Sequence, residues 1–120
     1  MNFYNATYRT IKLAGHVNMG VEVIPPGRAR ITVNKHATLV GLEDAGIHLY
    51  DVKFQPVIGL EEATELAGPD AIIIVSADVL AAMEEQGLST VRFAKVGDIL
   101  SLDDVGRPVY EGLVVSKDFF

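Results

Sequence analysis

The sequence predicts an α+β fold of the two-layer α/β type, a mainly antiparallel sheet with two helices packed on one side. Apolar and polar side chains alternate with the period of strands up to Phe54, and two later segments change to the period of helices. A chain of 120 residues has the commonest size of one domain. We therefore expect residues 1–120 to form a single domain around one core.

The first half is predicted to be a meander of antiparallel strands. Residues 7–13 are rich in Tyr, Thr and Ile, and residues 17–24 alternate before the turn at 25–27, where two prolines precede a glycine. Residues 30–33 alternate again, which would place Arg28 and Arg30 on one strand face. Residues 47–54 continue the pattern.

The second half carries both predicted helices, at residues 60–67 and 77–86. The first is followed by Gly68-Pro69, and the second has Ser76 as its N-cap and Gly87 after its end. The β-branched run at 71–75 is typical of a central strand covered on both faces. Short strands are expected after the second helix, at residues 90–94, 99–102, 108–110 and 113–115.

Composition narrows the classes of function. The chain has no cysteine, which excludes disulfides, thiolate metal sites and thiol nucleophiles, and it begins without the pattern of a secretory signal. These features predict a cytoplasmic protein without a cofactor. The net charge is −6, and residues 59–120 carry twelve acids against four bases, so genomic nucleic acid is not an expected partner. A membrane is not expected either, since the longest apolar run, at residues 71–75, is far shorter than the roughly 20 residues of a membrane span. A small phosphorylated ligand needs only two or three arginines.

Ser76 follows the central strand, where three roles are open to it. It can cap the helix through its hydroxyl. It can be a hydrolase nucleophile, although the flanking glycines of a nucleophile elbow are missing. Together with Ala77 it can also present the unpaired N–H groups of the helix N-terminus to an anion.

No other constellation predicts catalysis or a metal site. The spacings of His16, His36 and His48 match no local metal-binding pattern. Carboxylates occur as pairs adjacent in sequence, and such neighbours do not oppose each other across a cleft.

The few arginines are the candidate ligand-binding residues. Arg28 and Arg30 follow the proline turn, Arg92 follows the second helix, and Arg107 opens the last hairpin. Each can instead form a weak surface ion pair with the abundant acids. One aromatic ring among Tyr8, Tyr50, Phe54, Phe93 and Tyr110 would complete a nucleotide pocket by stacking on a base.

The chain resembles a family of small phage-encoded proteins. The shared motifs are Asn5-Ala6-Thr7 with Ile11, the turn Ile24-Pro25-Pro26-Gly27-Arg28-Ala29-Arg30, the strand end Ile74-Val75-Ser76, and Val91-Arg92 with Gly106-Arg107. They occur in order over most of the length. The chain differs from the family's Pro-His at Tyr8-Arg9 and from its Asp at Phe93.

Part of that group is similar to the first-described Thoeris anti-defence sponges of phages. The resemblance implies a homo-oligomer, a dimer or higher and up to a hexamer, that sequesters a cyclic ADP-ribose isomer in the host cytoplasm without cleaving it. It also implies binding of cyclic oligonucleotides such as CBASS signals. In this reading Arg92 and Ser76 or Ala77 occupy a pocket at the end of the central strand, with Phe93 beside them. Arg107 or Arg28 then reaches in from an adjacent subunit.

Two other function classes stay open. An interaction or structural protein of a phage, without a small-molecule ligand, would use the apolar C-terminal segment 113–120. An enzyme acting on the same nucleotide would release a product.

Overall fold

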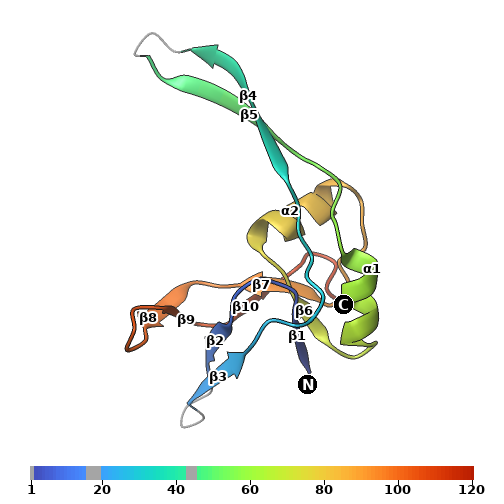
Figure 1. The fold of residues 1–120 in the computed structure, drawn as a ribbon, viewed down its shortest axis with the longest axis vertical. Helices are drawn as coiled ribbons and strands as arrows, with labels where there is room; N and C mark the ends of the chain where they lie inside the picture. The colour runs from blue at the N-terminus through green and yellow to red at the C-terminus, as the bar shows by residue number, and fades with distance from the viewer. Residues whose placement is uncertain (1, 16–19, 43–45) are drawn as a thin grey trace.

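The computed structural model describes residues 2–15, 20–42 and 46–120 and has an α+β fold (Figure 1). In these residues the elements are β1 (Phe3–Asn5), β2 (Ile11–Ala14), β3 (Val21–Ile24), β4 (Lys35–Leu42), β5 (His48–Phe54), α1 (Leu60–Ala67), β6 (Ile72–Ile74), α2 (Ala77–Glu85), β7 (Phe93–Val96), β8 (Ile99–Leu102), β9 (Pro108–Tyr110) and β10 (Leu113–Val115). Both helices and the last three strands lie where the sequence predicts them.

The sheets are mixed, so the prediction of a mainly antiparallel sheet is wrong. One sheet has the order β1-β6-β7-β10, with β1, β6 and β7 parallel and β10 antiparallel to β7. The second has the order β3-β2-β9-β8, with a parallel step from β2 to β9. The parallel pairs arise because β1 and β6 are joined through other elements and not by a hairpin, a connection that alternation in a single strand does not reveal.

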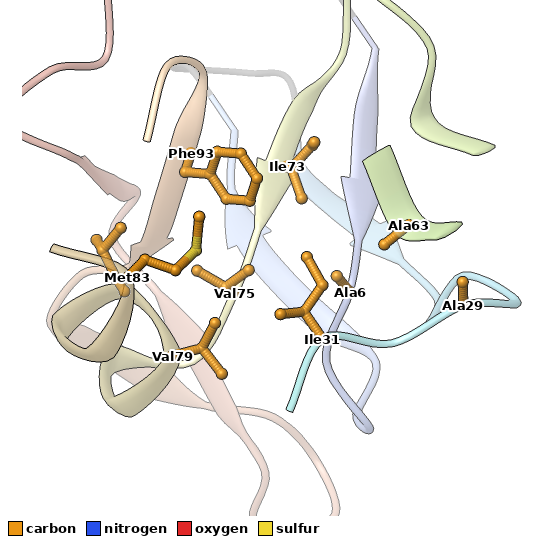
Figure 2. Packing of buried hydrophobic residues seen from close by; sticks show 10 residues of the cluster. Ala6, Ala29, Ile31, Ala63, Ile73, Val75, Val79, Met83 and Phe93 are labelled. Atoms are coloured by element: carbon orange, nitrogen blue, oxygen red, sulfur yellow. The ribbon is translucent and has the colours of Figure 1, made fainter. Parts of the chain in front are cut away.

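The central strand β6 separates two hydrophobic clusters. Ile73 and Val75 pack with Ala63 of α1 and with Val79 and Met83 of α2, so both helices cover the same face of the first sheet (Figure 2). Ile74 points the other way and packs with side chains of the second sheet, namely Ile11, Leu13 and Ile24. The body is therefore built of helices, sheet and sheet, one layer more than the predicted two.

The strand predicted at residues 7–13 begins only at Ile11, as β2, and residues 7–10 form a loop between β1 and β2. The side chain of Asn5, 1% exposed, accepts hydrogen bonds from the backbone N and Oγ1 of Thr7, at 3.0 and 2.6 Å. Its Nδ2 donates to the carbonyl of Arg9 at 2.7 Å and to that of Ile24 at 3.0 Å. This local bonding competes with a strand ladder and bends the backbone into a loop.

Residues 30–33 also form no strand apart from one isolated bridge between Thr32 and Ile58. Arg28 and Arg30 therefore do not share a strand face. The long strand begins later, at β4, which pairs with β5 in an antiparallel ribbon that projects from the body (Figure 1). We call β4 and β5 the arm. The predicted strand at 17–24 is observed as β3, and residues 17–19 lie outside the described part.

The arm has one apolar and one polar face. Cross-strand partners with side chains on the same face are Ala37 with Val52 and Leu39 with Tyr50. The alternate pairs are His36 with Lys53 and Thr38 with Asp51. Leu39, Tyr50 and Val52 remain 49–58% exposed in the single chain. An isolated two-stranded ribbon is marginally stable in water, and an exposed apolar face of this kind is typical of an interaction surface.

Candidate functional site

A cleft of about 920 Å³ lies where the parallel strands β1, β6 and β7 end. Its lining comprises the loop after β1 (Thr7, Tyr8, Arg9, Thr10) with Ile11 and Lys12, the segment before the arm (Pro26, Ile31, Thr32, Val33), the start of α2 (Val75, Ser76, Ala77, Asp78, Val79), and Val96, Arg107, Pro108 and Tyr110. Ligands of open α/β sheets bind outside the carboxyl ends of parallel strands. The volume lies within the range of about 300–1,000 Å³ that is typical of ligand sites.

The N-terminus of α2 forms one wall of this cleft. Ser76 is the N-cap, and its Oγ accepts a hydrogen bond from the backbone N of Val79 at 3.2 Å, which confirms the capping role. The first turn of a helix has backbone N–H groups without intrahelical partners, and the helix dipole favours an anion beside them. Ser76 and Ala77 are exposed, so this wall is accessible.

The loop after β1 forms the opposite wall, and Asn5 determines its shape. Because Asn5 bonds both ends of the loop, at Thr7 and at the Arg9 carbonyl, the side chains of Tyr8 and Arg9 are held at the cleft. The Arg30 guanidinium carbon lies 4.7 Å from the centre of the Tyr8 ring, a cation–π contact that orients the ring further. Tyr8 is still 64% exposed, which leaves ring surface for a ligand.

Arg107 enters the cleft from the turn between β8 and β9. Asp103 organises this turn, since its Oδ1 accepts from the backbone N of Val105 at 3.0 Å and of Arg107 at 2.8 Å. Its Oδ2 accepts from Lys12 Nζ at 2.7 Å. The Lys12 ammonium and these backbone donors lower the pKa of Asp103 from 3.8 to about 2. Asp103 thus joins the turn to β2.

The cleft is positive in an acidic chain. Arg9, Lys12 and Arg107 line it, against one carboxylate, Asp78. Lys35 neutralises Asp78 at 3.1 Å, and Asp103 neutralises Lys12. Within residues 2–15, 20–42 and 46–120, neither Arg9 nor Arg107 has an ion pair, and both are exposed. Two guanidinium groups are therefore free to bind an anion at the helix N-terminus.

The structure brings together some of the predicted site residues and separates others. Ser76, Ala77 and Arg107 line the cleft. Arg30 contacts it only through Tyr8, and Arg28 is exposed outside it. Arg92 and Phe93 line a different, smaller cavity. The strand predicted at 90–94 begins only at Phe93, and the Phe93 side chain is buried in the core.

Sequence reasoning missed Arg9 and Lys12. The strand predicted at 7–13 includes both residues, and its alternating pattern does not reveal the loop that carries Arg9. Lys12 lies in β2, and its side chain faces the cleft. The signal available was Asn5 followed two residues later by Thr7, a pattern that favours a side-chain-bonded turn over a strand.

Comparisons with models of protein families, with curated proteins and with solved structures find no match to this chain. Within the described residues there is no group of three or more His, Asp or Glu side chains placed to hold a metal ion. His16, one of the three histidines considered from the sequence, lies outside them. None of the described helices has the length and apolar character needed to cross a bilayer.

Proposed function

We propose that this chain binds a phosphorylated nucleotide signal in the cleft and sequesters it without degrading it. The observation that carries the proposal is the convergence of Arg9, Arg107 and the α2 N-terminus at the carboxyl ends of three parallel strands. Each of these features binds phosphate in its own right. They meet in a protein whose net charge of −6 otherwise repels anions.

The ligand class follows from the size and the walls of the cleft. A pyrophosphate accepts hydrogen bonds from the two guanidinium groups and the first turn of α2. A base stacks on Tyr8 or Tyr110, and the hydroxyls of Thr10 and Thr32 are hydrogen-bonding partners for ribose. A cyclic ADP-ribose isomer has all three parts. The resemblance to Thoeris anti-defence sponges supports the same ligand and a role in the cytoplasm of a phage-infected cell, with cyclic oligonucleotides of CBASS as a second class.

The arm supports a homo-oligomer. Its apolar face, carrying Leu39, Tyr50 and Val52, is covered in this proposal by the same surface of a second copy. The arm begins at Lys35, two residues after Val33 of the cleft lining.

Isothermal titration with cyclic ADP-ribose isomers, followed by denaturation and mass spectrometry, tests the proposal. It predicts saturable heat and recovery of the ligand unchanged in mass and amount. Absence of heat contradicts binding, and a product of different mass identifies an enzyme.

The arm also favours a second candidate, an interaction module without a nucleotide ligand. In that case the apolar face is covered by a different protein, and the chain purifies with no nucleotide and as a monomer. Light scattering on the purified chain separates the two candidates, since the sponge is predicted to be an oligomer.

A further inference from the structure

A second cavity, of about 280 Å³, lies beneath α1 and shares no lining residue with the cleft. It is lined by Leu60 and Thr64 of α1, by Ile73 of β6, and by Ser89, Val91, Arg92 and Phe93. Ile73 and Phe93 lie side by side at its base in the core (Figure 2). Most of the wall is apolar, and Arg92 is its cation.

Arg92 has a backbone conformation that its residue type rarely adopts. Its φ is +65°, and it is the one residue other than glycine with positive φ in the described part of the chain. Such a conformation is strained and persists only where the surroundings enforce it. Here the amide of Arg92 donates to the Phe119 carbonyl at 2.8 Å, and its carbonyl accepts from Ile73 N at 2.9 Å.

The side chain of Arg92 carries a second cost. Its Nη1 is buried and has no hydrogen-bond partner in the part of the chain that the structure describes. A buried, unpaired donor destabilises a fold, and it does so more when the group is charged. Glycine at this position would avoid both costs. Backbone strain and a buried, unpaired donor on one residue that lines a cavity point to a ligand.

We propose that this cavity binds a small monocarboxylic acid with a compact, branched apolar tail. The carboxylate pairs with the Arg92 guanidinium and accepts from the Ser89 hydroxyl, while the tail contacts Leu60, Ile73 and Phe93. The Thr64 hydroxyl is already engaged, since it donates to the Leu60 carbonyl at 2.6 Å. One cation matches one negative charge.

A phosphate is a poorer match for the same cavity. Its second charge would need a further cation or several more donors, which the lining does not contain. The surrounding half of the chain, residues 59–120, carries twelve acids against four bases, and this field opposes a doubly charged anion more than a singly charged one. The proposal is independent of the nucleotide-binding function of the cleft.

The test uses isobutyrate as the probe and isobutyramide as its neutral analogue of the same shape. In an NMR titration of the full chain, isobutyrate is expected to shift the Val91 and Leu60 methyl signals saturably at millimolar concentration. Isobutyramide and inorganic phosphate are expected to bind at least ten times more weakly. Equal affinity for isobutyramide would mean that the cavity recognises apolar shape and not the carboxylate. Tighter binding of phosphate would mean that the ligand is a phosphate and not a carboxylic acid. Either result overturns the proposal.

Two variants separate a ligand role of Arg92 from a structural one. Arg92→Gly is expected to lose isobutyrate binding by tenfold or more while its melting temperature stays equal or rises, because glycine relieves the backbone strain and removes the buried, unpaired Nη1 donor. Arg92→Lys keeps the charge and is expected to retain part of the affinity. If Arg92→Gly unfolds, or binds isobutyrate as well as the wild type does, Arg92 is a structural residue and the proposal fails.

Discussion

Replacing Asn5 by alanine tests whether one buried amide shapes the cleft from outside it. The substitution removes four hydrogen bonds, two donated by Nδ2 to the Arg9 and Ile24 carbonyls and two accepted by Oδ1 from Thr7. The bond to the Ile24 carbonyl is buried, so water does not readily replace it. At roughly 1 kcal/mol for each bond, less what water recovers at the exposed end of the loop, the expected loss of stability is about 3 kcal/mol.

This loss translates into a melting temperature that calorimetry or circular dichroism can measure. With an unfolding entropy of about 2.1 cal/mol/K for each of 120 residues, a loss of 3 kcal/mol lowers the melting temperature by about 12 °C. Thr7→Val is the matched control, because it removes the hydroxyl bond to Asn5 Oδ1 but keeps the Asn5 amide. The same hydroxyl also makes two longer, exposed bonds with the Arg9 backbone, which water can replace, so the expected cost is about 1 kcal/mol, or about 4 °C.

Asn5→Ala is also expected to weaken nucleotide binding at temperatures where the variant is still fully folded, although Asn5 does not line the cleft. The reason is that Tyr8 and Arg9 are no longer held in one loop conformation. The reasoning is refuted if Asn5→Ala melts no lower than Thr7→Val, or if its affinity for cyclic ADP-ribose equals that of the wild type.

Three further variants test other features of the molecule. Gly59→Ala is expected to destabilise the fold by about 3 kcal/mol, since φ is +88° and a Cβ would collide with the Arg30 carbonyl. Urea unfolding measures this free energy, and a loss below about 1 kcal/mol contradicts the predicted collision. The pKa of Asp103 is lowered to about 2, so its contribution to the free energy of unfolding is complete above about pH 4 and is lost as the pH falls toward 2. Asp103→Asn should therefore show a smaller decrease in the free energy of unfolding between pH 4 and pH 2 than the wild type. An unchanged decrease contradicts the ion pair with Lys12. Leu39→Lys with Tyr50→Lys should convert an oligomer to monomers in light scattering, and an unchanged mass excludes the arm as the interface.

Sequence patterns predicted the helices well because their signals are local. The Ser76 cap, the glycine after α2 and the Gly68-Pro69 stop lie within a few residues of the ends they determine. The positions of β8, β9 and β10 were also predicted, since turn residues separate them. The predicted hairpin of 108–110 with 113–115 is wrong, because β9 pairs with β2 and β8 in one sheet and β10 pairs with β7 in the other. The same is true of β6, whose β-branched run reflects burial on both faces.

The errors arose where long-range pairing or a single side chain overrides the pattern. Parallel pairing of β1 with β6 joins residues about seventy positions apart, and no local signal encodes it. Arg92 has a left-handed backbone that propensity would assign to glycine, which delays the start of β7 and moves this arginine out of the cleft. Of the predicted ligand residues, Ser76, Ala77 and Arg107 meet in the cleft, because each lies at an element boundary that the sequence marks.

The central claim is that Arg9 and Arg107 bind the phosphates of a nucleotide in the cleft. Its most direct test is a calorimetric titration of cyclic ADP-ribose into the wild type, into Arg9→Gln with Arg107→Gln, and into Arg28→Gln, an exposed arginine outside the cleft. Two charge-assisted contacts of about 1.5 kcal/mol each predict at least a roughly 100-fold weaker Kd for the double variant and an unchanged Kd for Arg28→Gln. Equal affinity of the double variant and the wild type would contradict the account.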